Sequence, residues 1–295
     1  MTLRTAAWVL LAGGLIAGSL GAPPADVVPR QAGGYWVLDA DFHVHAFAGD
    51  GALAPWALRR EAQRAGLEVF ALTNHNQTVT ARIARWLADS TPGPIVLVGQ
   101  EVTNRDYHIS AVGIEATIDA GQPAAKVIED IHAQGGVAIA NHPESPNYTA
   151  AYDDRALRSL DGFERAHPVL YSTPARTASF ESFAARVTAV NPAAAFIGSS
   201  DYHGGGTPGW CRTYVLARER TAASVIEAVR DGRTVAADPD GKLFGPPEYV
   251  QLVQTVGGGR RPETNDWQAT TASAVAWLGL LGLVVAPRRA QRRAT

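Results

Sequence analysis

The chain has 295 residues, in which 26 Lys and Arg face 28 Asp and Glu, giving a formal net charge of −2. This balance excludes a strong electrostatic attraction to nucleic acid, so no stable nucleic-acid partner is expected. The single cysteine, Cys211, excludes an intramolecular disulfide and is expected to be a small buried residue. Roughly 215 residues between two apolar ends are enough for one sizeable domain.

The first 21 residues have the pattern of an export signal. Arg4 precedes an apolar run from Ala6 to Ala22, and small residues lie near Gly21. An uncleaved N-terminal anchor is the alternative, because the apolar run approaches the length that spans a bilayer. Both interpretations predict that the following domain is exported.

Strand-like and helix-like segments alternate through a domain expected to cover residues 35–245. The expected strands are 35–41, 67–73, 95–98, 109–114, 137–140, 160–165, 194–199, 213–217 and 234–237. The expected helices are 54–65, 79–88, 124–134, 180–190 and 222–230. This alternation predicts an α/β fold with a parallel sheet and crossover helices.

The C-terminal part begins with glycine and proline clusters, which predict a linker over 246–269. Residues 270–286 carry no charge and are followed by four arginines in a basic tail, 287–295. This pattern predicts a C-terminal transmembrane segment with a cytoplasmic tail, and hence a membrane-tethered domain in the periplasm or at the cell surface. A hydrophobic helix packed on the domain and a processed sorting signal are the alternatives.

Six of the eight histidines follow short apolar runs, as do several carboxylates. His43 and His45 are two positions apart, so both point to one face of a strand. The other candidates are His75, His108, His142 and His203, with Asp50, Glu101 and Asp201. Imidazole and carboxylate groups converging at strand ends predict a site for two to three divalent ions, Mn, Zn or Fe. His132, in an amphipathic helix, and His167, before a proline, are expected to lie outside it.

The order of these motifs resembles the PHP family, named after polymerase and histidinol phosphatase. The matching motifs are His-x-His at 43–45 with the later Asp-Gly at 50–51, Thr-x-His at 73–75, Gly-x-Glu at 99–101, His108, His-Pro at 142–143 and Ser-Asp-x-His at 200–203. The resemblance implies a distorted (β/α)7 barrel with a trinuclear metal centre, here flanked by hydrophobic terminal segments. Residues 211–235 also look like the branch that includes carbaryl and other carbamate-ester hydrolases.

The resemblance also implies which residues hold each ion. The first set is His43, His45, Glu101 and Asp201; the second shares Glu101 and adds His108 and His142; the third is Asp50, His75 and His203. Glu101, Asp201 and His203 are therefore the implied catalytic residues.

Four further residues are candidates near these motifs. Asn74 stands where the family usually has an aspartate, and Glu164 matches a position that is often acidic. Both are expected to support the ligands from behind, although Asn74 cannot supply a negative charge there. Arg105 and Arg165 lie near motif ends and can grip a phosphate, with an ordinary surface arginine as the alternative for each.

The expected chemistry is hydrolysis of a phosphate ester. Two cations bridged by Glu101 lower the pKa of a shared water, and the resulting hydroxide attacks phosphorus in line. The sequence therefore predicts a phosphoesterase acting on small phosphate esters or nucleotides. The alternatives are a hydrolase of non-phosphate esters or carbamates, a 5′–3′ exonuclease on short oligonucleotides, and a non-catalytic metal-binding module. The sequence indicates no oligomeric state.

Overall fold

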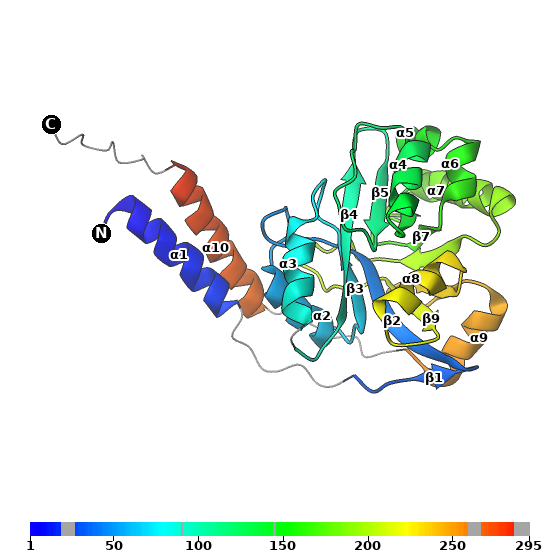
Figure 1. The fold of residues 1–295 in the computed structure, drawn as a ribbon, viewed down its shortest axis with the longest axis horizontal. Coiled ribbons are helices and arrows are strands. Elements are labelled where there is room, and N and C mark those ends of the chain that lie inside the picture. Colours follow the sequence, from blue (N-terminus) through cyan, green and yellow to red (C-terminus); the bar gives the residue numbers. More distant parts are fainter. Residues whose placement is uncertain (19–26, 90, 144–145, 259–266, 286–295) are drawn as a thin grey trace.

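The computed structural model describes residues 1–18, 27–89, 91–143, 146–258 and 267–285 (Figure 1). The expected cleavage near residue 21, most of the expected linker beyond 258 and the basic tail 287–295 lie outside the described residues. The helices are α1 (Leu3–Ala17), α2 (Pro55–Arg64), α3 (Val79–Ala88), α4 (Ala124–Ala133), α5 (Pro146–Ala151), α6 (Asp154–Ser159), α7 (Pro174–Val190), α8 (Ala222–Arg230), α9 (Pro247–Val256) and α10 (Trp267–Val285). The strands are β1 (Gln31–Ala32), β2 (Tyr35–Val44), β3 (Val69–Leu72), β4 (Ile95–Thr103), β5 (His108–Val112), β6 (Val137–Ala140), β7 (Gly162–Ala166), β8 (Ala195–Gly198), β9 (Arg212–Ala217), β10 (Thr234–Ala237) and β11 (Leu243–Phe244).

The described strands form one sheet in the order β11-β10-β9-β2-β3-β4-β5-β6-β7-β8, with β1 added to β2. The sheet curves until β8 meets β9, so it nearly closes into a barrel. At this seam the Gly198 N–H donates to the Thr213 hydroxyl, which in turn donates to the Gly198 carbonyl, both at 2.9 Å. Gly198 is required there, because a Cβ atom would overlap the carbonyl of Arg212.

The expected α/β fold is observed, but the sheet is mixed rather than parallel throughout. β2, β3 and β4 are parallel, and so are β6, β7 and β8, whereas β5 and β9 run antiparallel to their neighbours. Only a short turn joins β4 to β5, and a parallel pair would need a long crossover. As a result β5 starts at the rim where β4 ends, which places His108 opposite Thr103 and close to Glu101.

Strand β2 extends farther than expected, and its alternation separates apolar from polar residues. Leu38, Ala40 and Phe42 join an apolar cluster with β3, β9 and α8. Asp39, Asp41 and His43 occupy the alternate positions and therefore point to the opposite face, although all three are buried. The strand thus carries a row of buried polar groups that ends at His43.

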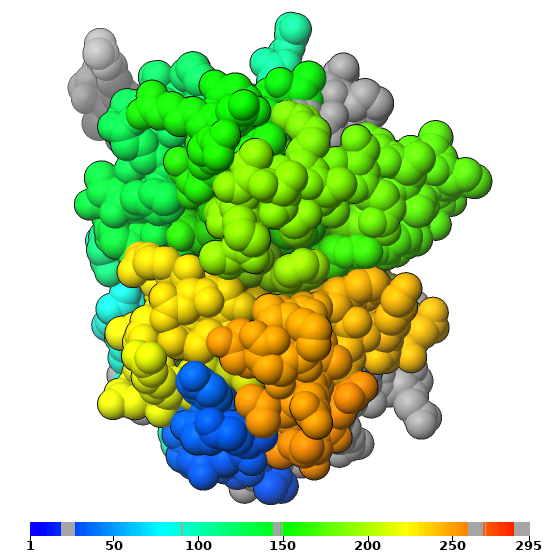
Figure 2. Space-filling model, turned by 90° about the vertical axis from the view of Figure 1, so that its right-hand side faces the viewer, coloured from blue at the N-terminus to red at the C-terminus, as the bar shows by residue number. Residues whose placement is uncertain are grey.

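Several helices lie where the sequence predicted loops. α5 and α6 follow β6. Asp153 is the N-cap residue of α6, and its carboxylate accepts the Ala156 N–H at 2.8 Å. α9 occupies the start of the expected linker, because Val253 packs against Tyr214 and Val235. Figure 2 shows α9, in orange, beside the blue N-terminal strands. The folded unit therefore continues past residue 245.

The terminal helices α1 and α10 pack on each other as an antiparallel pair that projects from the barrel (Figure 1). Gly14 on α1 lies against Ala272 and Ala276, and Gly279 on α10 lies against α1 in the same way, leaving no room for a Cβ atom. In the described part of the chain, no helix combines the length and the apolar character that crossing a bilayer requires. The transmembrane segment expected over 270–286 is therefore not supported.

Candidate metal centre

Seven of the eight histidines, all of which lie in the described residues, converge on one rim of the barrel. They lie at the end of β2 or just after it, follow β3, β6, β7 and β8, or begin β5, and three carboxylates join them. Three groups have donor atoms that all lie within 4.8 Å of one another: His45, Asp50, His75 and His203; His43, Glu101 and His142; and His43, His167 and Asp201. The second and third groups share His43, and His45 Nε2 connects the first group to them at 3.5 Å from Glu101 Oε2 and 3.3 Å from Asp201 Oδ1, so the three form one continuous cluster.

Four donors in the buried part of this cluster match the first expected ligand set. The Nε2 atom of His43 lies 3.3 Å from Glu101 Oε2 and 3.1 Å from Asp201 Oδ1. The corresponding distances from His45 Nε2 are 3.5 and 3.3 Å. A tetrahedral ion with ligands at about 2.0–2.1 Å requires ligand atoms about 3.3–3.4 Å apart. The spacing of these donors therefore fits a divalent ion.

Three of these atoms lack other partners. No described residue makes a hydrogen bond of normal geometry to His45 Nε2, Glu101 Oε2 or Asp201 Oδ1, although all three atoms are buried. Buried polar atoms almost always have a partner, so three orphaned atoms that face the same point need an explanation. A bound cation supplies one, because all three atoms are good metal donors.

Glu101 spans the first and second expected ligand sets. Its Oε2 atom faces His43 and His45, whereas Oε1 lies 2.9 Å from His108 Nδ1 and 3.3 Å from His142 Nε2. Burial raises the pKa of Glu101, but the charge of His43 and the hydrogen bonds of His108 and His142 outweigh burial and hold that pKa well below its usual range. The residue is therefore an ionised carboxylate whose two oxygens face the two expected ligand sets.

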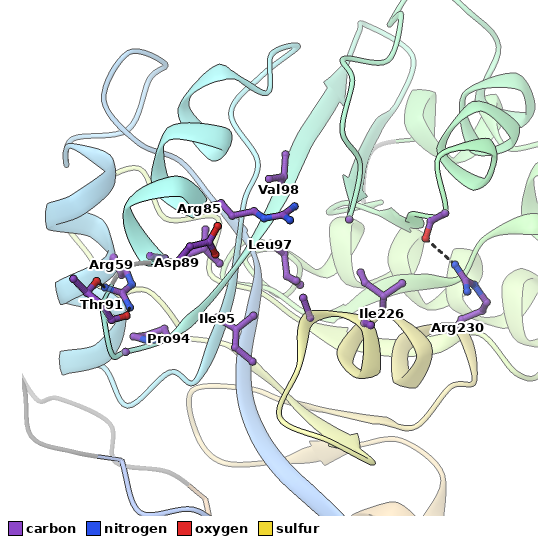
Figure 3. Close-up of a pocket in the computed structure, with 17 residues that line it drawn as sticks. Arg59, Arg85, Asp89, Thr91, Pro94, Ile95, Leu97, Val98, Ile226 and Arg230 are labelled. Atoms are coloured by element: carbon purple, nitrogen blue, oxygen red, sulfur yellow. Dashed lines mark hydrogen bonds between the residues drawn. The ribbon is translucent and has the colours of Figure 1, made fainter.

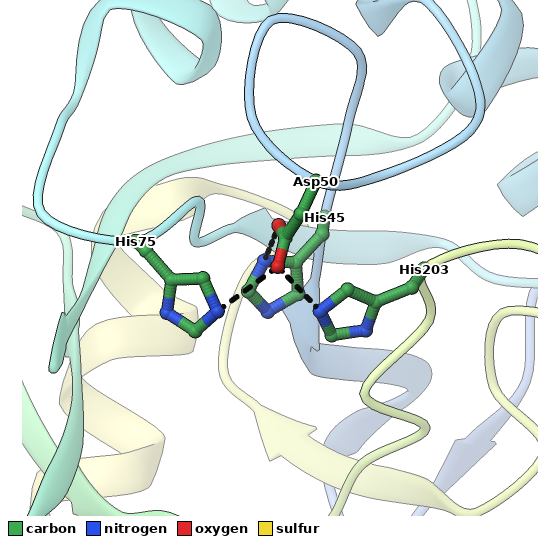
Figure 4. A group of neighbouring side chains, drawn as sticks. All are labelled: His45, Asp50, His75 and His203. Carbon is green, nitrogen blue, oxygen red and sulfur yellow. Dashed lines mark hydrogen bonds and ion pairs between the residues drawn. The ribbon is translucent and has the colours of Figure 1, made fainter.

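The third expected set lies on the outer side of the cluster (Figure 4). Asp50 Oδ2 lies 3.0 Å from His203 Nε2 and 3.1 Å from His75 Nε2, and Asp50 Oδ1 lies 3.0 Å from His45 Nδ1. The Nδ1–H of His203 donates to the carbonyl of Asp201 at 2.9 Å. In the neutral ring this leaves His203 Nε2 unprotonated and facing Asp50, as metal binding requires.

The backbone near two of these donors is held in an uncommon conformation. His142 and Asp201 have φ angles of 27° and 50°, in the left-handed region that non-glycine residues rarely adopt. The loop after β8 is fixed by Asp41, which accepts hydrogen bonds from the Ser200 hydroxyl at 2.5 Å and the Gly209 N–H at 2.7 Å. Backbone strain that is kept at converging polar residues is typical of a functional site.

Glu164 supports His43 and His142 from behind. Its Oε1 atom lies 2.9 Å from His43 Nδ1, and its Oε2 atom accepts the backbone N–H of His142 at 2.5 Å. Because Nδ1 then carries the proton, Nε2 of His43 is free for a metal. Burial raises the pKa of Glu164, but the charges of His167 and His43 outweigh burial, so that pKa is lowered.

Asn74 contacts a loop rather than a ligand. Its side-chain oxygen accepts the Ala46 N–H at 2.7 Å, and its amide donates to the Ala46 carbonyl at 3.1 Å. Gly49 packs so closely on this amide that a Cβ atom there would overlap it. An aspartate cannot donate to the carbonyl. The asparagine therefore matches the loop that leads to Asp50.

His167 lies at the cluster, contrary to the expectation from sequence. Its side chain is 1% exposed, and its Nε2 atom lies 3.6 Å from Asp201 Oδ2 and 3.8 Å from Glu164 Oε2. The Val169 N–H donates to His167 Nδ1 at 3.2 Å, so the proton of the neutral ring is on Nε2, directed at these carboxylates. His167 is therefore within ion-pair distance of Asp201, although Nε2 makes no hydrogen bond of normal geometry to a described residue. The sequence did hold a signal, since His167 follows β7 at the same rim as the other histidines.

Tyr148, on α5, is a second residue at the cluster that no sequence pattern indicated. Its hydroxyl lies 3.2 Å from His108 Nε2, and the two rings stack with centroids 4.9 Å apart. It is carried by α5, a helix that was not expected from the sequence.

Neither candidate arginine is directed at the cluster. The side chain of Arg105 is 92% exposed and pairs with Asp106. Arg165 lies over the ring of Phe244 and pairs with Glu181 at 3.1 Å. The alternative of ordinary structural or surface arginines fits these described contacts. His132 pairs with Asp161, outside the cluster as expected, and Cys211 is buried as expected.

A cavity of about 610 Å³ lies elsewhere, between β4, α3 and α8 (Figure 3). Arg59, Arg85 and Arg230 line it, but they already bind Thr91, Glu115 and the Gly135 carbonyl. Its described lining contains no histidine. A cavity of about 500 Å³, by contrast, adjoins Asp50 and His203.

Comparisons with known proteins agree with this architecture. No family model matches the chain. It is 30% identical over 138 residues to the uncharacterised protein MJ1587 of Methanocaldococcus jannaschii. The matched region covers 43% of this chain and 80% of that protein.

Two solved structures are similar. One is a two-domain protein of Bacteroides vulgatus, described as containing a predicted PHP-like metal-dependent phosphoesterase; the TM-score is 0.62, with 21% identity over 80% of this chain and 75% of that one. The other is PsfC of Pseudomonas syringae, with a TM-score of 0.50 and 14% identity over 75% and 96% of the two chains. The chain therefore belongs to the same family as MJ1587 and has the fold of the PHP-like protein of B. vulgatus.

Proposed function

We propose that this protein is a metal-dependent phosphoesterase of the PHP type, which releases phosphate from small phosphate esters or nucleotides. The observation that carries the proposal is the set of three buried, orphaned donor atoms on His45, Glu101 and Asp201, which face the same point. The fold shared with the B. vulgatus protein supports the same chemistry.

The donor set suits two to three divalent transition-metal ions such as Mn, Zn or Fe, because imidazole and carboxylate are the ligands these ions share. Such ions polarise a phosphoryl oxygen and lower the pKa of water to near neutrality. In this role Glu101 holds the two buried ligand sets together, while Glu164 fixes the orientation of His43 and His167 lies beside Asp201. Asp50, His75 and His203 form the side that a substrate can reach.

The test is a substrate panel with the full chain loaded with Mn²⁺. The panel contains p-nitrophenyl phosphate, a nucleoside 3′,5′-bisphosphate, a short 5′-phosphorylated oligonucleotide and 1-naphthyl acetate. We expect phosphate release from the first two. Glu101→Gln keeps the shape but removes the bridging charge, and should lower kcat/KM by about 10³-fold or more, since metal catalysis supplies several kcal/mol. His132→Ala is the matched control and should be nearly silent.

Other outcomes separate the alternatives. Hydrolysis of 1-naphthyl acetate alone would support the carbamate-ester branch, and stepwise trimming of the oligonucleotide would support an exonuclease. Metal binding without any hydrolysis would support a non-catalytic module. Normal turnover by Glu101→Gln would contradict the role of the bridge.

We also propose that the domain is exported and attached to a membrane surface through the α1–α10 helix pair. Apolar side chains on α1 support this, since Trp8, Val9 and Ile16 are exposed. Alkaline phosphatase fused after Gly257 should be active in cells, and the full chain should sediment with membranes. Trp8→Ser with Val9→Ser should release it, and a soluble cytosolic full chain would contradict the proposal.

A further inference from the structure

A cavity of about 500 Å³ lies directly beside the outer part of the metal centre. One side is formed by Asp50, Ala52 and His203, and the other by helix α10. Asp50 and His203 are 45% and 37% exposed at their side chains, so the third ligand set opens into this space. A molecule that is bound at that set and extends into the cavity therefore contacts α10 as well.

The α10 side of the cavity is apolar and continuous. Its lining residues are Thr270, Ala274, Trp277, Leu278 and Leu281, whose spacing places them on one face of the helix. Leu278 and Leu281 remain 64% and 60% exposed. Large apolar side chains left open beside charged metal ligands form a site with two chemistries, polar at one end and apolar at the other.

The position of this wall is fixed by specific contacts. The Trp277 indole N–H donates to the Gly51 carbonyl at 3.4 Å, and its ring packs on Phe47 with centroids 4.5 Å apart. Both partners belong to the loop that carries Asp50. Behind the wall, Gly14 allows α1 to lie in direct contact with α10. The helix is therefore joined to the loop that carries a ligand of the metal centre.

We propose that this cavity binds the apolar part of an amphiphilic phosphate ester, an alkyl or acyl chain or an aromatic ring, whose phosphoryl group lies at Asp50, His75 and His203. This substrate class rests on the proposed function for the position of the phosphate. The evidence for an apolar group in the substrate is the lining by the leucines and Trp277 of α10, none of which is a metal donor.

The direct test is binding of non-hydrolysable methyl-, butyl- and octylphosphonate to the Mn²⁺-loaded full chain, measured by calorimetry below the micelle concentration. Because burying a methylene favours transfer from water, affinity should rise roughly 2–4-fold for each methylene that enters the cavity. The matching alkyl phosphates should show the same trend in kcat/KM. Equal affinity for all three chain lengths would overturn the proposal.

Two variants locate the effect. Leu278→Ser with Leu281→Ser should remove most of the gain with chain length while leaving methylphosphonate binding within about twofold, since both side chains are already largely exposed. Val285→Ser changes an exposed residue of the same helix outside the cavity and should keep the gain. An unchanged gain in the double variant would overturn the proposal.

The two proposals fail in different ways. Phosphate release that is independent of chain length, with chain-independent phosphonate binding, would overturn the apolar cavity and leave the phosphoesterase standing. Binding that depends on chain length, without hydrolysis of any phosphate ester, would support the cavity and overturn the phosphoesterase.

Discussion

The metal centre has a buried half and an exposed half, and the two are held in place differently. His43 and His45 are fully buried and Glu101 is 1% exposed, and protein groups such as Glu164 orient them from behind. Asp50, His75 and His203 are 35–45% exposed at their side chains, and Asp50 contacts both histidines directly. The comparison shows that the buried half is enclosed by protein groups, whereas the outer half is open to solvent.

The largest expected effect is a difference in bound metal between a variant of the buried half and a variant of the outer half. His43→Ala removes a donor from the buried set, so we expect loss of tightly bound metal and a fall in kcat of about 10³-fold or more. His203→Ala should retain the buried ions and lose the outer one, with weaker substrate binding. Elemental analysis after stepwise dialysis against a chelator measures both. Equal loss of all ions in the two variants would contradict a division into halves.

A smaller effect is expected when the support behind the buried half is changed. Glu164→Gln keeps a hydrogen-bond acceptor near His43 but removes the charge. Changing such a supporting residue typically costs 10–100-fold in metal affinity or activity. Metal titration with a competing chelator checks this, and Glu181→Gln is the matched control on the outer surface. A Glu164→Gln affinity equal to that of the unmodified chain would contradict the supporting role.

Metal affinity should also depend on pH through the buried half. Burial lowers the pKa of His43, but the charges of Asp201, Glu101 and Glu164 outweigh it and hold that pKa well above 6.5 in the metal-free protein. A raised pKa means that a proton must leave before Nε2 binds an ion, so affinity should fall as pH decreases, by up to about tenfold per unit for one proton. Calorimetry in two buffers of different ionisation enthalpy should detect the released proton.

The smallest effect concerns the loop between the halves. Asn74→Asp introduces the family's usual residue but replaces the donor to the Ala46 carbonyl with a carboxylate oxygen. We expect a loss of about 1–3 kcal/mol in the free energy of unfolding, because a buried carbonyl loses its partner. Thermal unfolding of the metal-free protein measures it, and Asn76→Asp, outside this contact, is the comparison. Greater stability in Asn74→Asp would show that the loop can rearrange.

The convergence of the histidines was predictable because it depends on local spacing. His43 and His45 share a strand face, and most of the other donors directly follow apolar strands whose ends meet at one rim. Their role as ligands stays a prediction. The helices α3 and α8 and the strands β6 and β10 also have the expected bounds, because their apolar periodicity agrees with their final burial.

The remaining features depend on contacts between distant segments, which local patterns do not encode. Arg165 lies near a motif, but its guanidinium packs on Phe244, which is far along the chain. His167, before a proline, was expected outside the cluster but lies at it. The apolar residues of α10 were interpreted as a membrane span, and their actual neighbours, α1 and the loop at Gly51, are more than 220 positions away.

The metal centre also closes long loops of the chain. Asp50 and His203 are 153 positions apart in the sequence. The chain has a single cysteine, so no disulfide can link its distant segments. A covalent link closing a loop of this length removes denatured-state entropy equivalent to about 5 kcal/mol. An ion held by both residues constrains the unfolded chain in the same sense for as long as it stays bound. In the proposed metal-loaded protein, the ion is therefore a reversible cross-link between the loops that follow β2 and β8.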